Sequence, residues 1–510
     1  MKKSFLKTAS VVTGLSVAER GLGFLYRIVL ARMIGAEGLG VYQVALSVFA
    51  VFATLGTGGI PVTVSRLISK SKAERDFHAD GSAVSAGLLA CLIVTLPVPL
   101  SFALFGDSLS FLFTDKRALD VFLILAVGLV FSCLYAVLRG WFWGHKRFLT
   151  TSLLEISEES VMVIVGVLLL NGVNSSVSGA KSAALAAVLS YLFSFTCSAV
   201  CFFACKGKLQ SPKTQWKPLI GSAAPITGVR LGSTLVNSAV AILLPVMLIR
   251  GGMTESEALK TFGVLSGMVL PVLFVPATVI GALSLVLVPE LAEDFYGGRK
   301  ERLQKNVLRG LNAASVVACV IIPFFAVLGK ELGLLAYASP LAGEMIEKSC
   351  PILLPMSLTM ISTSALNSMG FEKQTFRYYF IGAAANLLCI CVLPAVAGGY
   401  AYLIGIAVSF VLCAVLNLRL LFSKVFEGKR TGFFKRTLGL VASVLPVALL
   451  GEFVSLSAEW ICGDVLGAII VFLVMAAASC VPLLIFYPSL KREKVSPQSG
   501  RTQTGAGATV

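Results

Sequence analysis

The feature that most constrains this chain is a succession of long apolar segments joined by short polar ones. Hydrophobic residues make up 57% of the 510 residues and charged residues only 13%. In a bilayer every backbone polar group must be satisfied within its own segment, so helices are the expected form. We therefore predict an all-α polytopic membrane protein with about 14 transmembrane helices, over residues 5–34, 40–65, 82–105, 119–142, 150–171, 181–205, 218–249, 260–290, 306–329, 348–369, 376–397, 400–423, 434–456 and 464–487.

The spacing of these spans predicts two six-helix lobes plus two C-terminal helices. Six spans precede a basic segment and six more follow it, as in transporters built from parallel repeats. The predicted parts are an N-terminal lobe, a cytoplasmic linker, a C-terminal lobe, two additional helices and a disordered polar tail, at residues 1–205, 206–217, 218–425, 426–490 and 491–510.

Lysine and arginine collect in alternate loops, which predicts the orientation. With the predicted spans, 31 of the 42 basic residues fall on the side of the amino terminus and eight on the opposite side. Basic loops remain in the cytoplasm, so both termini should be cytoplasmic. The remaining three, Arg20, Arg27 and Arg230, lie away from the ends of their spans and are the ones predicted to be inside the membrane.

The first span carries two of these arginines. Arg20 and Arg27 are seven residues apart and share a helix face with Thr13 and Ser16. A central arginine costs about 2.5 to 3.5 kcal/mol on insertion scales, so this polar face should line an internal cavity that holds an anion. The alternative is a structural ion pair, in which a glutamate of the fifth span neutralises Arg20.

The seventh span repeats the pattern of the first. Arg230 shares a helical stripe with Thr227, Thr234 and Asn237, which we expect to add polar groups to the same cavity. The long spans should also bend, because glycine and proline interrupt their hydrogen bonding. The expected hinge residues are Gly56, Gly58, Gly59, Pro61, Pro225, Pro271 and Pro276.

Three carboxylates in the fifth span are equally unusual. Glu155 and Glu159 share a face, and Glu158 is turned away from Glu155 by about 60 degrees. Such groups could couple transport to Na⁺ or H⁺, or pair with the arginines. The alternative is that they lie at the level of the cytoplasmic headgroups.

The sequence argues against several other classes. It contains no nucleophile elbow, phosphate-binding loop or paired metal-ligand motif, so we expect no catalytic residue, no metal site and no resident cofactor. The net charge of +16 follows the membrane topology, and we expect no nucleic-acid partner. Transport is the leading class.

Several motifs resemble the stage V sporulation protein B-like branch of the polysaccharide transporter family. The opening block Ala18-Glu19-Arg20-Gly21-Leu22-Gly23-Phe24 is the most specific. Further matches are Arg27, Gly35-Ala36-Glu37-Gly38-Leu39-Gly40-Val41-Tyr42, Gly59-Ile60-Pro61, Arg139-Gly140-x-Phe142-x-Gly144 and Asn386. Relatives often carry Glu-Gln-x-x-Arg in the fifth helix, whereas this chain has Glu158 without the arginine. An acid that follows the first helix of lipid II flippases is also missing here, at Leu39-Gly40-Val41.

The resemblance implies a flippase of the superfamily that contains lipid II flippases, O-antigen flippases and multidrug extruders. The implied cargo is a saccharide carried on undecaprenyl pyrophosphate, moved outward by alternating access, with Arg20 at the position of a pyrophosphate-binding arginine. The resemblance implies a bacterial cytoplasmic membrane location and a role in cell-wall, spore-cortex or surface polysaccharide synthesis. We expect a monomer that works beside polysaccharide-synthesis enzymes and is driven by the membrane potential, with Na⁺ or H⁺ coupling left open.

Two alternatives remain at this stage. The first is a cation-coupled multidrug extruder of the same superfamily, which would bind its cargo through carboxylates. The second is a membrane scaffold or an enzyme of polysaccharide assembly. An enzyme should show an outward-facing catalytic acid or histidine, and both histidines fall in predicted cytoplasmic loops.

Overall fold

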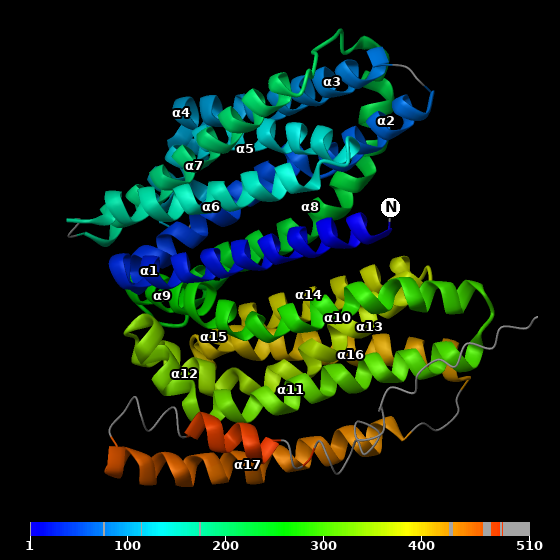
Figure 1. The fold of residues 1–510 in the computed structure, drawn as a ribbon. Helices are drawn as coiled ribbons and strands as arrows, with labels where there is room; N and C mark the ends of the chain where they lie inside the picture. The colour runs from blue at the N-terminus through cyan, green and yellow to red at the C-terminus, as the bar shows by residue number, and fades with distance from the viewer. Residues whose placement is uncertain are drawn as a thin grey trace, which may run out of the picture. The chain divides into compact units, whose positions relative to one another are not determined.

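The computed structural model describes residues 2–74, 77–113, 115–172, 175–427, 432–462, 471–479 and 482. In this part of the chain every regular element is a helix, which confirms the predicted all-α class (Figure 1). The helices are α1 (Lys2–Thr57), α2 (Ile60–Glu74), α3 (Phe77–Thr95), α4 (Pro97–Leu109), η1 (Ser110–Leu112), α5 (Lys116–Gly144), α6 (Phe148–Leu170), α7 (Ser176–Ala204), α8 (Lys213–Arg250), α9 (Glu255–Gly263), η2 (Val264–Val269), α10 (Leu270–Tyr296), α11 (Lys300–Tyr337), α12 (Pro340–Ser349), η3 (Cys350–Ile352), α13 (Leu353–Ser368), α14 (Glu372–Val392), α15 (Pro394–Ala397), α16 (Tyr400–Phe426) and α17 (Phe433–Cys462).

Eleven helical stretches among the described residues are long and apolar enough to cross a membrane. They account for twelve of the fourteen predicted spans, because spans 5–34 and 40–65 join in one stretch, Gly14–Lys72. The predicted span 150–171 corresponds to α6, whose three glutamates exclude it from the eleven. The predicted span 464–487 is described mainly over 471–479, which is helical, and the tail 491–510 lies outside the described residues.

The chain divides into two compact units, each made of separate segments. Unit 1 comprises residues 1–275, 329–352 and 373–416, and unit 2 comprises 276–328, 353–372 and 417–510. This division follows packing density and does not test the predicted lobes 1–205 and 218–425, which stay a prediction.

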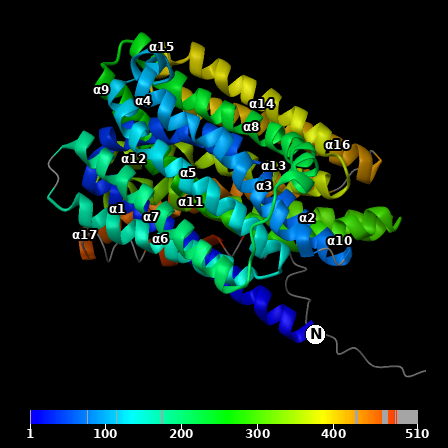
Figure 2. The same cartoon turned by 90° about the horizontal axis from the view of Figure 1, so that it is seen from above.

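In unit 1, α1 is the central helix. It contacts α5, α6, α7, α8 and α9, and both cartoon views show α1, α6 and α7 side by side (Figures 1 and 2). The helical run is broken at Gly35, whose φ of 72° and ψ of 176° are not helical. A positive φ of this kind is readily adopted only by glycine. The two halves of α1 can therefore take different directions.

The second half of α1 packs directly against α9. A Cβ atom on Gly263 would lie 2.6 Å from the backbone nitrogen of Gly40 and closer still to the carbonyl oxygen of Ala36. Only glycine allows two backbones to approach this closely. The helix then continues as a π-helical turn over Val264–Val269, just before Pro271. Proline has no backbone N–H and disturbs the α-helical hydrogen-bond ladder, which accounts for the wider turn.

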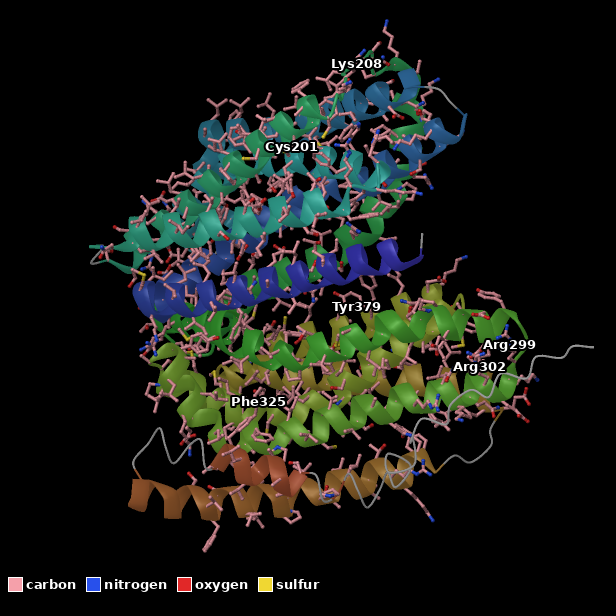
Figure 3. The ribbon with its side chains drawn as sticks, in the orientation of Figure 1. Cys201, Lys208, Arg299, Arg302, Phe325 and Tyr379 are labelled. Atoms are coloured by element: carbon pink, nitrogen blue, oxygen red, sulfur yellow. The ribbon has the colours of Figure 1, made fainter. Side chains whose placement is uncertain are left out.

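In unit 2, a polar cluster holds the turn between α10 and α11. The side chain of Asp294 is 1% exposed and lies 3.7 Å from Arg299 and 3.4 Å from Arg302. Asn306 donates a hydrogen bond of 2.9 Å to the same carboxylate. Figure 3 labels the two arginines at this end of the helices. Asp294 of α10 thus contacts Arg299 of the turn and both Arg302 and Asn306 of α11.

Candidate functional site

The two arginines of the first span both lie on α1. Arg20 and Arg27 are exposed, and in the described part of the chain neither makes an ion pair or a side-chain hydrogen bond. Ser16 is half-buried nearby on the same helix, and Thr13 is outside the side chains that the structure describes. Both guanidinium groups are therefore available to a ligand.

A different arginine pairs with one of the glutamates of the fifth predicted span. Arg139 of α5 lies 3.2 Å from the carboxylate of Glu155 on α6. Its guanidinium also stacks 5.0 Å from the ring centre of Trp143, where a cation–π contact adds stability. The described residues thus give no support to the alternative in which a glutamate of this span pairs with Arg20. Sequence reasoning counted Arg139 only among the basic residues of the cytoplasmic side, near the end of the predicted span 119–142, and missed this role.

The three glutamates lie well inside α6. This helix begins at Phe148, so Glu155 and Glu159 are roughly 10 and 16 Å along its axis at 1.5 Å per residue. All three side chains are half-buried. The Glu159 carboxylate rests against α1, where a Cβ on Gly23 would lie 2.8 Å from its Oε1 atom. The absence of a side chain at Gly23 allows the carboxylate to reach the backbone of the arginine-bearing helix.

Two buried tyrosines accompany these carboxylates. Tyr26 of α1 and Tyr135 of α5 are 5% and 6% exposed, and their hydroxyl groups have no hydrogen-bond partner among the described residues. The charges of Glu155 and Glu158 act on the Tyr135 hydroxyl, and that of Glu159 acts on Tyr26. Sequence reasoning also missed these tyrosines, because a tyrosine in an apolar span gives no signal that it faces a carboxylate.

The predicted polar stripe of α8 divides into two environments. Thr227 accepts a hydrogen bond of 2.9 Å from the backbone N–H of Gly59, and the hydroxyl of Thr234 lies 3.1 Å from that of Thr54. Thr234 therefore connects α8 to α1, and Thr227 connects α8 to the gap between α1 and α2. Arg230 is exposed and makes no ion pair in the described part of the chain.

Asn237 of the same stripe lines a cavity of about 220 Å³ in unit 1. Gln43 and Ser47 of α1, Ser266 of η2 and Tyr402 of α16 supply its other polar groups. None of the three arginines lines it. The cavity is neutral, and the structure places the predicted anion-binding residues elsewhere on α1 and α8.

The predicted hinge residues fall at helix breaks or inside long helices. Gly56 lies near the end of α1, Gly58 and Gly59 in the gap before α2, and Pro61 in the first turn of α2. A Cβ on Gly59 would lie 2.9 Å from Cα of Ala223, so the break packs closely on α8. Pro225 and Pro276 lie inside helices, and Pro271 follows the π-helical turn.

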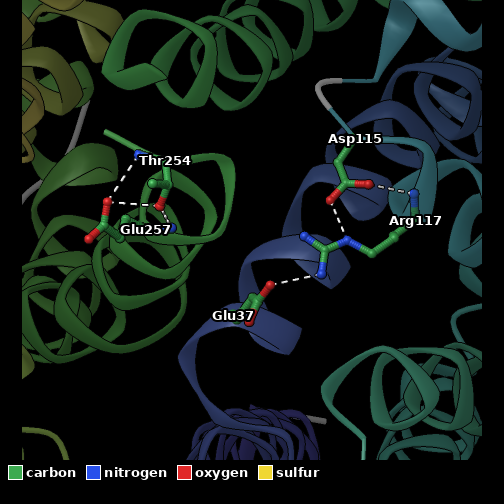
Figure 4. Close-up of polar contacts among 5 residues, drawn as sticks. All are labelled: Glu37, Asp115, Arg117, Thr254 and Glu257. Atoms are coloured by element: carbon green, nitrogen blue, oxygen red, sulfur yellow. Dashed lines mark hydrogen bonds and ion pairs between the residues drawn. The ribbon is translucent and has the colours of Figure 1, made fainter. Parts of the chain in front are cut away.

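A charged network lies at the start of the second half of α1. Arg117 lies 2.8 Å from Glu37 of α1 and 2.5 Å from Asp115, which caps α5 (Figure 4). Figure 4 also shows Thr254 and Glu257, which form a reciprocal capping box at the start of α9. These groups anchor the ends of their helices.

The comparisons with known proteins identify the class. Residues 5–294 match the family described as polysaccharide biosynthesis protein, and since this is more than half of the chain, the chain belongs to that family. The resemblance seen in the sequence motifs is thereby confirmed at the level of the family.

Among curated proteins, the chain is similar to stage V sporulation protein B of Bacillus subtilis strain 168. The two are 24% identical over 404 residues, covering 77% of this chain and 78% of the relative. The lipid II flippase MurJ of the same organism is 21% identical over 425 residues, covering 76% and 77%.

Among solved structures, an inward closed conformation of the lipid II flippase MurJ matches with a TM-score of 0.73 at 13% identity, covering 94% of this chain and 100% of that one. An inward-facing multidrug MATE family transporter matches with a TM-score of 0.67 at 15% identity, covering 81% and 96%. These likenesses show that the fold is a multi-pass helical membrane fold shared by both kinds of transporter.

Proposed function

We propose that this chain is a flippase that moves an undecaprenyl-pyrophosphate-linked saccharide from the inner to the outer leaflet by alternating access. The similarity to stage V sporulation protein B and to MurJ, a lipid II flippase, supports this class of cargo. The observation that carries the proposal is the pair of arginines on α1. Arg20 and Arg27 lie in a helix long and apolar enough to span a membrane, are exposed, and make no ion pair among the described residues.

A pyrophosphate is the natural counter-ion for such a pair. Guanidinium groups form charge-assisted, often bidentate hydrogen bonds with phosphate oxygens. Arg230 of α8 is a third exposed cation without an ion pair in the described part of the chain and would assist from its own helix. The saccharide would occupy polar space and the polyprenyl tail would stay in lipid.

The membrane potential supplies a driving force for an anionic cargo. An inside-negative potential favours outward movement of negative charge by about 2.3 kcal/mol per charge per 100 mV. With both termini in the bacterial cytoplasm, as the positive loops predict, the cargo would be captured from the inner leaflet. Polysaccharide-synthesis enzymes would supply and consume it.

The test is flipping of a fluorescent undecaprenyl-pyrophosphate disaccharide in proteoliposomes under an imposed potential. Arg20→Gln and Arg27→Gln should each slow flipping by roughly 10-fold or more, because a hydrogen bond to a charged group contributes about 1.5 to 3 kcal/mol. The matched control is Arg250→Gln, since Arg250 is also exposed and without an ion pair among the described residues but lies at the end of α8.

A multidrug extruder remains the rival, because the fold is shared with a MATE family transporter. An extruder should carry a cationic dye and should lose that activity when the α6 carboxylates are changed. Dye transport that is indifferent to Arg20→Gln, together with no flipping of the lipid-linked sugar, would replace the flippase proposal. A scaffold or a polysaccharide-assembly enzyme would move neither compound.

A further inference from the structure

The neutral cavity of unit 1 gathers polar side chains from helices that are far apart in the sequence. Gln43 of α1, Asn237 of α8 and Tyr402 of α16 line its volume of about 220 Å³. None of these three side chains makes a hydrogen bond in the part of the chain that the structure describes. Their donors and acceptors are therefore available to a ligand in one shared space.

Two serines add acceptors, and apolar groups form the rest of the wall. The hydroxyls of Ser47 and Ser266 donate to carbonyl oxygens of their own helices at 2.7 and 2.8 Å, so toward the cavity their oxygens can only accept. Phe262 and three aliphatic side chains complete the lining, and no charged side chain is among the described residues that form it. Ser266 belongs to the π-helical turn, a feature that is frequent at functional sites.

These walls favour a neutral ligand that both donates and accepts hydrogen bonds. A carboxamide offers two N–H donors and a carbonyl acceptor, and a phenol hydroxyl can donate and accept. A charged ligand would lose its hydration without meeting an opposite charge, which is costly. A sugar ring matches the lining, because its hydroxyl groups donate and accept at the edge while its apolar C–H faces can pack on Phe262.

The volume limits the size of the ligand. Sites for drug-sized ligands measure roughly 300 to 1,000 Å³, so a cavity of about 220 Å³ suits one sugar ring better than an oligosaccharide. A bare cation is the wrong size in the other direction, because oxygen ligands must converge to roughly 2.0 to 2.6 Å from it. Within the described residues, no group of three acidic, histidine or cysteine side chains could hold a metal ion.

The cavity also lies in register with a proposed cargo arginine. Arg230 and Asn237 are seven residues apart on α8, so they share a helix face and are separated by roughly 10 Å along the axis. Pro225 and Pro245 fall outside this stretch, which leaves the helix between the two residues without a proline. A cargo whose anionic group contacts Arg230 can therefore place a neutral part in the cavity.

We propose that this cavity is a sugar subsite, in which Gln43, Asn237 and Tyr402 recognise one ring of the cargo saccharide through neutral hydrogen bonds. This inference rests on the proposed function, because it takes the sugar to be attached to the pyrophosphate that the arginines bind. The arginines supply affinity for the anion that every lipid of this kind carries. The cavity distinguishes a lipid that carries the sugar from one that does not.

The experiment compares two lipids that differ only in the sugar. Undecaprenyl pyrophosphate and undecaprenyl-pyrophosphate-N-acetylglucosamine each displace a fluorescent undecaprenyl pyrophosphate from the full chain in nanodiscs. The ratio of their two dissociation constants is the sugar preference, and the contribution of the anion cancels in that ratio. The wild type should bind the sugar-bearing lipid more tightly.

Three variants test the lining. Gln43→Leu, Asn237→Leu and Tyr402→Phe should each lower the sugar preference by roughly 2- to 10-fold, the range for one neutral hydrogen bond, and should leave binding of the sugar-free lipid unchanged. Unchanged binding of that lipid also shows that each variant is folded. Gln374→Leu is the matched control, since Gln374 of α14 is half-buried in unit 1 and does not line the cavity. It should keep the wild-type preference.

The results separate this inference from the proposed function. If Arg20→Gln weakens binding of both lipids equally but the wild type shows no sugar preference, or the three variants retain it, the subsite is refuted and the anion site stands. If the wild type binds neither lipid, the proposed function fails and the subsite fails with it. A preference that falls in Gln43→Leu, Asn237→Leu and Tyr402→Phe but not in Gln374→Leu supports the subsite.

Discussion

Replacing Gly263 with alanine tests the close packing of α1 on α9. The added Cβ atom would lie 2.6 Å from the backbone nitrogen of Gly40 and 3.0 Å from its Cα, and closer still to the Ala36 carbonyl oxygen. To restore even 3.0 Å, the helices must separate by at least 0.4 Å at Gly40 and by more at Ala36. These neighbours are backbone atoms, which cannot rotate away as a side chain can.

The expected cost follows from overpacking. Inserting one methyl group into a tightly packed site costs about 1 to 3 kcal/mol, and backbone neighbours place this variant at the upper end. Gly281→Ala is the control, because no atom lies within 4 Å of a Cβ at that position in α10. Alanine in an open helical site should stabilise by about 0.4 to 1 kcal/mol, so the two variants have effects of opposite sign.

Thermal unfolding in detergent, followed by tryptophan fluorescence, measures both effects under one condition. Gly263→Ala should lower the midpoint, and Gly281→Ala should leave it unchanged or raise it. If Gly263→Ala unfolds at the wild-type temperature and still flips its cargo, the helices are not held at the distance described, and the argument for a glycine-dependent contact is wrong.

Two further predictions concern charged groups near helix ends. Asp294→Asn should destabilise the protein by about 1 to 3 kcal/mol, because it leaves two half-exposed arginines without their buried partner. Glu293→Gln is the control: its carboxylate is 65% exposed, so the change should cost less than about 1 kcal/mol. Chemical denaturation compares the unfolding free energies of the two variants. Burial lowers the pKa of His145, and the positive charges of Lys72 and Arg147 lower it further, whereas the negative charge of Asp80 raises it. The unfolded state therefore binds more protons than the folded state below about pH 6.5. Stability should therefore fall as the pH drops through that range, and His145→Gln should flatten this part of the pH profile; an unchanged profile would contradict the assignment.

The helical architecture was predictable from the sequence because its cause is local. A segment in lipid must satisfy its own backbone hydrogen bonds, so apolar length alone indicates a helix. The difference between fourteen predicted spans and eleven observed stretches has equally simple reasons. Two predicted spans join across Gly35 into one helical stretch, and the last predicted span lies mostly outside the described residues. The helix α6 is not counted among the eleven because it carries three glutamates.

The chemistry of the candidate site was visible in part. An arginine or a glutamate inside an apolar span is costly, so Arg20, Arg27, Arg230 and the α6 glutamates stood out by residue type. Their roles in cargo binding and coupling stay predictions. The fold and the family agree with the class of transporter to which these residues pointed.

The sequence by itself determined which segments are helices and which of them carry charge into the membrane. Tertiary structure alone decided the partners: Arg139 and not Arg20 pairs with Glu155, and Thr227 accepts a hydrogen bond from the backbone N–H of Gly59. The physical reason is the range of the interactions. Helix formation depends on neighbours within four residues, whereas a side-chain partner depends on how helices far apart in the sequence pack and rotate against one another.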